Sequence, residues 1–208
     1  IATNGSMTSY VAAVRGVIEK LNLAEVTLVG HSMGGQIGII LALQMPAVIS
    51  KLVLVCAAGI ETFTKEEADK LKAVTQQVYA NPISDDVLSR TFYHADAEIR
   101  ALLMHEHVVH QIGNFRHLSG LITSSVAGML NEPVNSFLSQ ISQPTLVING
   151  AMDTAIPNRW LHPHLTLMEL QSIAKKEIQN CEAVIFPMAG HYLPVDQPQD
   201  LARKISTF

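Results

Sequence analysis

The sequence has few cysteines and little charge. Only two of its 208 residues are cysteines, Cys56 and Cys181, which is too few for a disulfide framework and matches no metal-ligand spacing. A reducing compartment such as the cytoplasm is the expected location. Charged residues make up only 15% of the chain and hydrophobic ones 48%, a balance that excludes a disordered protein.

A cluster of basic residues is also missing. The chain has 14 Lys and Arg against 18 Asp and Glu, for a formal net charge of -4. A protein that neutralises a run of phosphates needs concentrated positive charge, so nucleic acid is excluded as the expected partner. The length favours one domain, with room for an insertion, and a core large enough to be stable without disulfides.

No apolar run is long enough to cross a membrane. The longest, Ile37 to Ile49, is interrupted by Gln44 and Pro46 and is shorter than the roughly 20 residues that a membrane-spanning helix needs. We expect no membrane span and interpret this run as part of a buried helix.

Short apolar runs alternate with helical patterns outside the middle of the chain. Residues Tyr10 to Leu21 show amphipathic helical spacing, with Ser6 as a candidate N-cap. Helices are also expected at Met33–Met45 and Leu165–Ile178. The expected strands are Val26–Val29, Lys51–Cys56, Thr145–Asn149 and Ala183–Phe186. Strands that are apolar along their whole length predict an α/β fold with a parallel sheet covered on both faces.

Between Ala58 and about Gln140 the pattern changes. This stretch holds no strand-like run, and its apolar residues recur at helical spacing. The helical patches are Lys65–Tyr79, Asp85–Phe92, Ala95–Val109 and Phe115–Leu130. We therefore predict a helical insertion.

The motif Gly30-His31-Ser32-Met33-Gly34-Gly35 stands directly between a predicted strand and a predicted helix. A G-x-S-x-G turn in this position is sharp, and side chains in place of Gly30 or Gly34 are expected to collide with the backbone. The serine hydroxyl would then project above the sheet, beside the N-terminus of the helix. The alternative is a glycine-rich turn that only packs tightly.

A nucleophilic serine needs a base and an acid to orient that base, and both residue types follow predicted strands. Asp153 follows the third strand and His191 the fourth. Taken alone, Asp153 could form a loop turn and His191 could be a surface histidine. Asp196 is a competing acid, but we expect it to cap a helix from Pro198 to Ile205. The order Ser, Asp, His is that of a triad on successive strand ends.

Three motifs, GHSMGG, NGAMD and AGHYLPVDQP, resemble those of the α/β-hydrolase family, and the resemblance spans nearly the whole chain. It implies Ser32 as nucleophile, Asp153 as orienting acid and His191 as general base and then acid. It further implies the backbone N–H of Met33 as one oxyanion donor. Residues 1–58 and 141–208 would form the hydrolase core, and residues 59–140 a helical cap over the pocket.

The sequence departs from the family at its N-terminal end. Family members usually place four strands before the helix that leads to the nucleophile, and a loop there supplies the second oxyanion N–H. No residue before Ile1 is given, so that donor has no counterpart in the sequence. The resemblance predicts either a fragment with roughly 60 to 90 further residues upstream or a divergent, reduced member.

The remaining histidines suggest no metal site. His107 and His110 could share a helix face, with His105 and His117 nearby, and His162 and His164 flank Pro163, but no cysteine or carboxylate pair completes a zinc pattern. We expect no metal and no cofactor.

These observations predict a cofactor-independent serine hydrolase that cleaves a carboxylic ester, or a similar acyl bond, through an acyl-enzyme. The expected partner is a small-molecule, mostly apolar acyl substrate. A C–C bond hydrolase or an aminopeptidase is the alternative within the same resemblance, since both also use a serine in this turn. A ligand-binding member without turnover is the alternative from another class.

Overall fold

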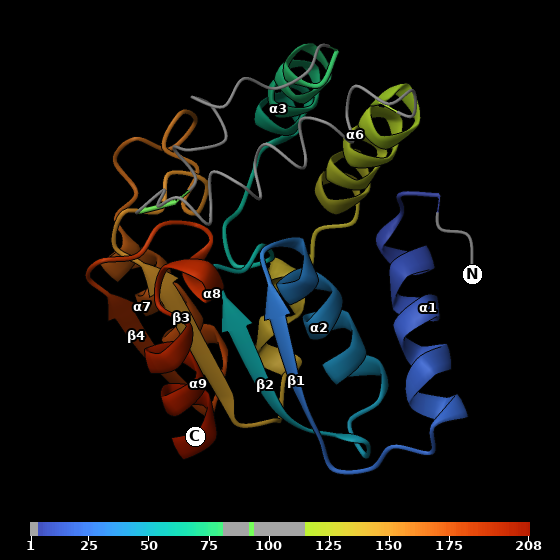
Figure 1. Cartoon of the computed structure of the whole chain (residues 1–208), viewed down its shortest axis with the longest axis vertical. Coiled ribbons are helices and arrows are strands. Elements are labelled where there is room, and N and C mark those ends of the chain that lie inside the picture. Colours follow the sequence, from blue (N-terminus) through green and yellow to red (C-terminus); the bar gives the residue numbers. More distant parts are fainter. Residues whose placement is uncertain (1–3, 81–91, 94–114) are drawn as a thin grey trace.

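A computed structural model of the chain describes residues 4–80, 92–93 and 115–208, without the side chains of residues 115–118 (Figure 1). Its centre is one sheet of parallel strands in the order β1-β2-β3-β4. The strands are β1 (Val26–His31), β2 (Ile49–Val55), β3 (Thr145–Gly150) and β4 (Cys181–Phe186). The α/β class and the parallel sheet predicted from the sequence are confirmed.

Helices connect and cover the strands. Those of the sheet region are α1 (Met7–Lys20), α2 (Met33–Gln44), α7 (Leu167–Glu177), α8 (Leu193–Asp196) and α9 (Pro198–Thr207). Between β2 and β3 the described helices are α3 (Lys65–Val78), α6 (Phe115–Asn131) and the 3-10 helix η2 (Asn135–Gln140). The predicted N-cap is confirmed, because the Ser6 side chain accepts a hydrogen bond from the N–H of Ser9. None of the helices in the described part of the chain could span a membrane.

Alternate residues of the inner strands face two separate cores, as the two-residue period of a strand requires. On one face Leu52 and Leu54 pack with α2 and α7. On the other face Val53 and Val55 pack with α8 and α9. The predicted cover on both faces is therefore confirmed for β2.

For the edge strand β1 the described residues cover one face only. Thr27 and Val29 point to the same face of the sheet as Val53 of β2. Helices α8 and α9 cover this face over β2, but Val29 is 47% exposed. Among the described residues no helix reaches this part of the face. The apolar run of β1 thus reflects one covered face and one face that is open in the described structure.

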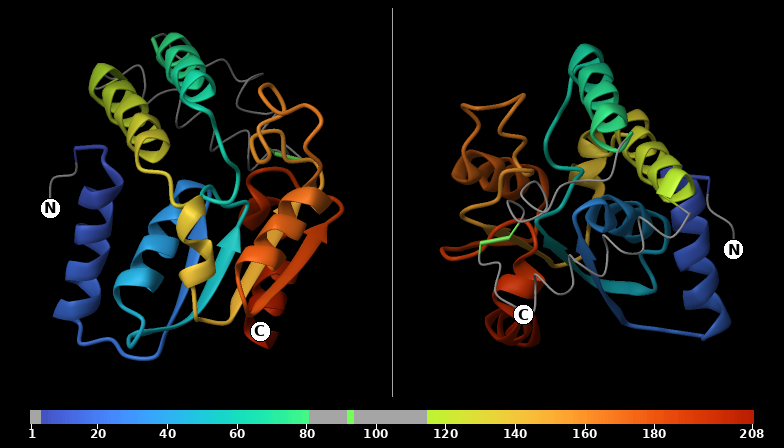
Figure 2. Two further views of the ribbon diagram at one scale, coloured as in Figure 1. Left: turned by 180° about the vertical axis from the view of Figure 1, so that it is seen from behind. Right: turned by 45° about the horizontal axis from the view of Figure 1, so that its top comes forward.

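Helices α3 and α6 lie above the carboxyl ends of the strands, where α3 packs against α6 (Figures 1 and 2). The side chain of Gln36 on α2 holds the end of α6, donating hydrogen bonds to the carbonyl oxygens of Met129 at 3.0 Å and Glu132 at 2.7 Å. Helix α3 begins with a capping box between Thr64 and Glu67. The described part of the insertion predicted from the sequence thus consists of helices and the irregular segments that join them, without a strand.

Two further helices predicted in the insertion, Asp85–Phe92 and Ala95–Val109, lie outside the described residues, apart from Phe92. The division into a core of residues 1–58 and 141–208 and a cap of residues 59–140 stays a prediction.

Candidate active site

Ser32 occupies the turn between β1 and α2 in a strained backbone conformation, with φ of 53° and ψ of -125°. Three backbone hydrogen bonds hold this conformation. Its N–H donates to the carbonyl of Val55 at 3.0 Å, and its carbonyl accepts from Gly35 at 2.9 Å and Ala58 at 3.0 Å. Strain of this kind persists only where the surroundings enforce it, and it gathers at functional sites.

The glycines of this turn differ in what they permit. A Cβ atom on Gly30 would lie against the carbonyl of Gly34, closer than real Cβ atoms come, as the sequence predicts. The same prediction is wrong for Gly34, where a Cβ would meet no atom within 4 Å outside its own helical turn. The crowded second position is Gly35, whose Cβ would collide with Ala57. The turn therefore needs Gly30 and Gly35, which bring α2 against the end of β2.

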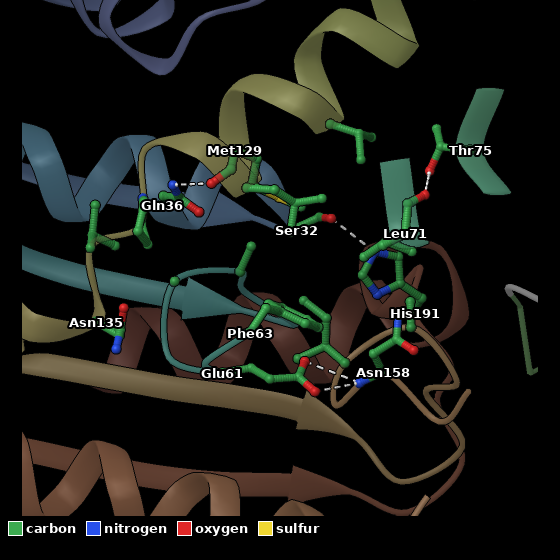
Figure 3. A pocket seen from close by; sticks show the side chains of 18 of the residues that line it. Ser32, Gln36, Glu61, Phe63, Leu71, Thr75, Met129, Asn135, Asn158 and His191 are labelled. Carbon is green, nitrogen blue, oxygen red and sulfur yellow. Dashed lines mark hydrogen bonds between the residues drawn. The ribbon is translucent and has the colours of Figure 1, made fainter. Parts of the chain in front are cut away.

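The structure brings Ser32, His191 and Asp153 together in one hydrogen-bonded row, of which Figure 3 shows the Ser32–His191 part. Nε2 of His191 lies 3.0 Å from Oγ of Ser32, and Nδ1 lies 2.9 Å from Oδ2 of Asp153. Asp153 is buried, and its other oxygen accepts the N–H groups of Ala155 at 2.8 Å and Ile156 at 3.0 Å. The carboxylate is thereby fixed, with one oxygen left for the imidazole.

The loops that carry Asp153 and His191 are joined to each other by backbone hydrogen bonds. The N–H of Ala151 donates to the carbonyl of Phe186 at 2.8 Å, and that of Met152 donates to Ala189 at 2.9 Å. Gly150 makes this approach possible, because a Cβ there would collide with the carbonyl oxygens of Ala189 and Gly190.

Asp196 does not have the role expected from the sequence. It is the last residue of α8, and the N-cap of α9 is Gln197, which makes no capping hydrogen bond with its side chain. The carboxylate of Asp196 instead accepts the N–H of Gly190 at 2.7 Å and the N–H of Tyr93 at 3.0 Å. The prediction of a helix cap is therefore wrong, because α8 turns this side chain back toward the loop before His191.

One side chain next to the row was not singled out from the sequence. The thiol of Cys56, at the end of β2, donates to the carbonyl of Gly190 at 3.8 Å. Its sulfur and one ligand atom each of Asp153 and His191 lie within 4.8 Å of one another, so these residues could in principle hold a metal ion. Burial, and then the charge of Asp153, raise the pKa of the Cys56 thiol well above its usual range, which disfavours the thiolate that a metal would bind.

The site lies beside a pocket of about 390 Å³ between the sheet ends and the helices above them (Figure 3). Ser32 and His191 stand in its wall. Its apolar wall includes Leu71 of α3 and Val126, Met129 and Leu130 of α6. The polar side chains on the wall include Gln36, Glu61, Asn135 and Asn158.

Glu61 is a buried carboxylate in this pocket. Its oxygens accept the N–H of Asn158 at 2.9 and 3.0 Å, and one of them lies 2.6 Å from Nδ1 of His162. The ring of Phe63 stacks on that of His162, with centroids 5.1 Å apart. Burial raises the pKa of Glu61, while these hydrogen bonds oppose the shift. The pair ties the segment before α3 to the loop that follows Asp153.

Six further histidines were considered from the sequence, and the structure describes the side chains of two of them. His162 pairs with Glu61 and His164 is exposed. His105, His107 and His110 lie outside the described residues, and the side chain of His117 is not described either.

The geometry defines a class of site: a serine on a strained strand-to-helix turn is hydrogen-bonded to a histidine, and this histidine is hydrogen-bonded to a buried aspartate, all at the ends of a parallel sheet. Residues 2–198 match the family model described as alpha/beta hydrolase fold. The chain belongs to the α/β-hydrolase family, as the resemblance implied.

Known proteins similar to the chain are named as hydrolases. It is 25% identical over 216 residues to a 2-hydroxy-6-oxononadienedioate/2-hydroxy-6-oxononatrienedioate hydrolase of Paraburkholderia xenovorans, covering 100% of this chain and 70% of the relative. It is 29% identical over 208 residues to an sn-1-specific diacylglycerol lipase of Mus musculus, covering 94% and 62%. The comparisons support an enzyme of the hydrolase class.

A solved structure shares the fold. An esterase from Exiguobacterium antarcticum superimposes with a TM-score of 0.75 at 22% identity, covering 100% of this chain and 75% of that one. The chain thus spans between 62% and 75% of the length of these proteins.

Proposed function

We propose that the chain carries the catalytic centre of a carboxylic ester hydrolase that works through an acyl-enzyme on Ser32. The observation that carries the proposal is the row in which His191 reaches Ser32 with one ring nitrogen and Asp153 with the other. In this row Nδ1–H donates to Asp153, which leaves Nε2 free to accept the serine proton.

In the proposed reaction Oγ of Ser32 attacks the ester carbonyl carbon while its proton passes to Nε2 of His191. The tetrahedral intermediate collapses as His191 protonates the departing alcohol, leaving the acyl group on Ser32. Water then attacks the acyl carbonyl carbon and gives a proton to His191, and His191 returns this proton to Oγ of Ser32 as the acid is released. Met33 is the first residue of α2, so its N–H has no partner within the helix and is our candidate oxyanion donor.

The pocket supports a small, uncharged and mostly apolar acyl substrate. Its described wall includes the acidic Glu61 but no lysine or arginine. The relative from Paraburkholderia is named for a substrate with two carboxylates. A dianion would lie beside Glu61 on a described wall that has no lysine or arginine, whereas the apolar wall suits an ester chain. We propose that residues 59–140 act as the cap that shapes this pocket.

C–C bond hydrolysis is the second candidate, favoured by the likeness to that relative over the whole chain. The test gives the protein p-nitrophenyl butyrate in one reaction and a 2-hydroxy-6-oxo dienoate in another, each compared with Ser32→Ala. We expect ester turnover that the Ser32→Ala change abolishes. Turnover of the dienoate alone would replace the ester assignment by the second candidate. Retention of either compound without product would indicate a binding protein.

A further inference from the structure

His31 joins the nucleophile strand to the loop that carries His191. It is the last residue of β1, directly before Ser32, and its Nε2 lies 2.7 Å from the backbone carbonyl oxygen of His191. A carbonyl oxygen can only accept, so Nε2 of His31 carries the hydrogen. The residues are 160 positions apart in the sequence, and this bond links them independently of the Ser32 hydroxyl.

The ring of His31 also packs against the rings of His191 and Tyr192. Its centroid lies 5.0 Å from that of His191 and 5.5 Å from that of Tyr192, with both ring pairs tilted. Burial lowers the pKa of His31, which favours the neutral ring.

Two hydrogen bonds hold the backbone at His191. One runs from His31 to the His191 carbonyl, and the other runs from the N–H of the preceding residue, Gly190, to Asp196. On the preceding side, Asp196 accepts the N–H of Gly190 at 2.7 Å. Among the described residues, the hydrogen bond from His31 is the one that ties the His191 carbonyl to the nucleophile strand. A general base has to stay within hydrogen-bond reach of the serine through proton uptake and release, so its backbone has to be held closely.

We propose that His31 is a positioning residue for the proposed reaction: its Nε2–H bond to the His191 carbonyl sets the distance between the base and Ser32. The inference rests on the proposed function, since it assumes that Ser32 and His191 react together. It concerns the hydrogen bond and not the bulk of the ring, and the two can be separated by substitution.

Two variants make that separation. His31→Gln keeps an N–H donor at similar reach and loses the ring, while His31→Phe keeps a ring and loses the donor. His164→Leu is the matched control, because it removes an exposed histidine from a loop. Each protein is assayed with p-nitrophenyl butyrate for kcat and KM, with a fluorophosphonate for the rate of covalent labelling, and by thermal melting.

For His31→Phe we expect kcat and the labelling rate to fall together by about 10- to 100-fold with KM unchanged, the effect of a displaced catalytic group. We expect His31→Gln to stay within about threefold of the parent protein. Parent-like rates in His31→Phe, or equal losses in both variants, would overturn the inference. If His31→Phe does not melt cooperatively, His31→Leu takes its place under the same criteria.

The Ser32→Ala variant in the same assay distinguishes a failure of the proposed function from a failure of the role of His31. If ester turnover survives in Ser32→Ala, the proposed function is wrong, and the role of His31 falls with it. If Ser32→Ala abolishes turnover while the donor-less His31 variants match the parent, only the role of His31 is wrong.

Discussion

The carboxylate of Asp196 binds the backbone N–H of Gly190 at 2.7 Å, one residue before the histidine whose ring Asp153 binds at 2.9 Å. Two acidic residues therefore hold the same loop in different ways. Asp153 sets the orientation and the tautomer of the imidazole, whereas Asp196 fixes only the main chain beside it.

This difference predicts unequal effects of the same substitution. Asp153→Asn should lower kcat by about 100- to 10,000-fold, because an amide can donate to Nδ1 and so favours the wrong imidazole tautomer. Asp196→Asn should cost less than about tenfold, because its amide oxygen still accepts the N–H of Gly190. Ester turnover of the two purified variants is the measurement. Equal losses, or a larger loss at Asp196, would contradict the assignment of the acid.

The crowding around the turn predicts which glycines accept a methyl group. Gly30→Ala and Gly35→Ala should each lower the free energy of unfolding by about 1–3 kcal/mol or prevent folding, since the added Cβ meets fixed backbone or Ala57. Gly34→Ala is the matched control within the same motif. It should be neutral or stabilising by up to about 1 kcal/mol, because the position is open and helical. Thermal melting compares the three, and a Gly34→Ala variant as unstable as the others would disprove the description of the turn.

The Glu61–His162 pair predicts a pH-dependent contribution to stability. Burial lowers the pKa of His162, but the carboxylates of Glu61 and Glu67 outweigh it and raise the pKa above 6.5. A raised histidine pKa contributes stability that is fully present below 6.5 and is lost as the pH rises through the folded value. Burial of Glu61 raises its own pKa and subtracts from the net effect of the pair.

His162→Gln tests this contribution. We expect its Tm to lie about 2–4 °C below that of the parent at pH 6, as for a contribution of about 1 kcal/mol, and the gap to narrow by pH 9. His164→Leu serves as the control, because that histidine is exposed. A gap that stays constant or widens with pH would show that protonation of His162 does not stabilise the fold.

The sequence allowed the sheet and the three side chains of the row to be predicted, for a local reason. Val26–Val29 and Thr145–Asn149 are short apolar runs with a turn directly after them, and parallel strands bring their carboxyl ends to one edge. Ser32, Asp153 and His191 each follow such a run, so their place in sequence indicated their place in space.

The rest depends on contacts that leave no local pattern. Glu61 and His162 are 101 residues apart, and neither belongs to a sequence motif from which its partner could be predicted. Asp196 precedes Pro198, a position that suggests a cap, yet the short α8 directs it to Gly190. Gly34 and Gly35 are adjacent and identical, and only the approach of Ala57 makes the second one necessary.

The central claim is that Ser32 is the nucleophile, and covalent labelling tests it most directly. The protein is treated with a fluorophosphonate, digested, and the modified peptide is identified by mass spectrometry, with Ser32→Ala treated in parallel. The account predicts one phosphonylated residue, Ser32, no labelling of Ser32→Ala, and a loss of ester turnover that follows the labelled fraction. A label on another serine with Ser32 unmodified, or ester turnover that persists in fully labelled protein, would contradict it.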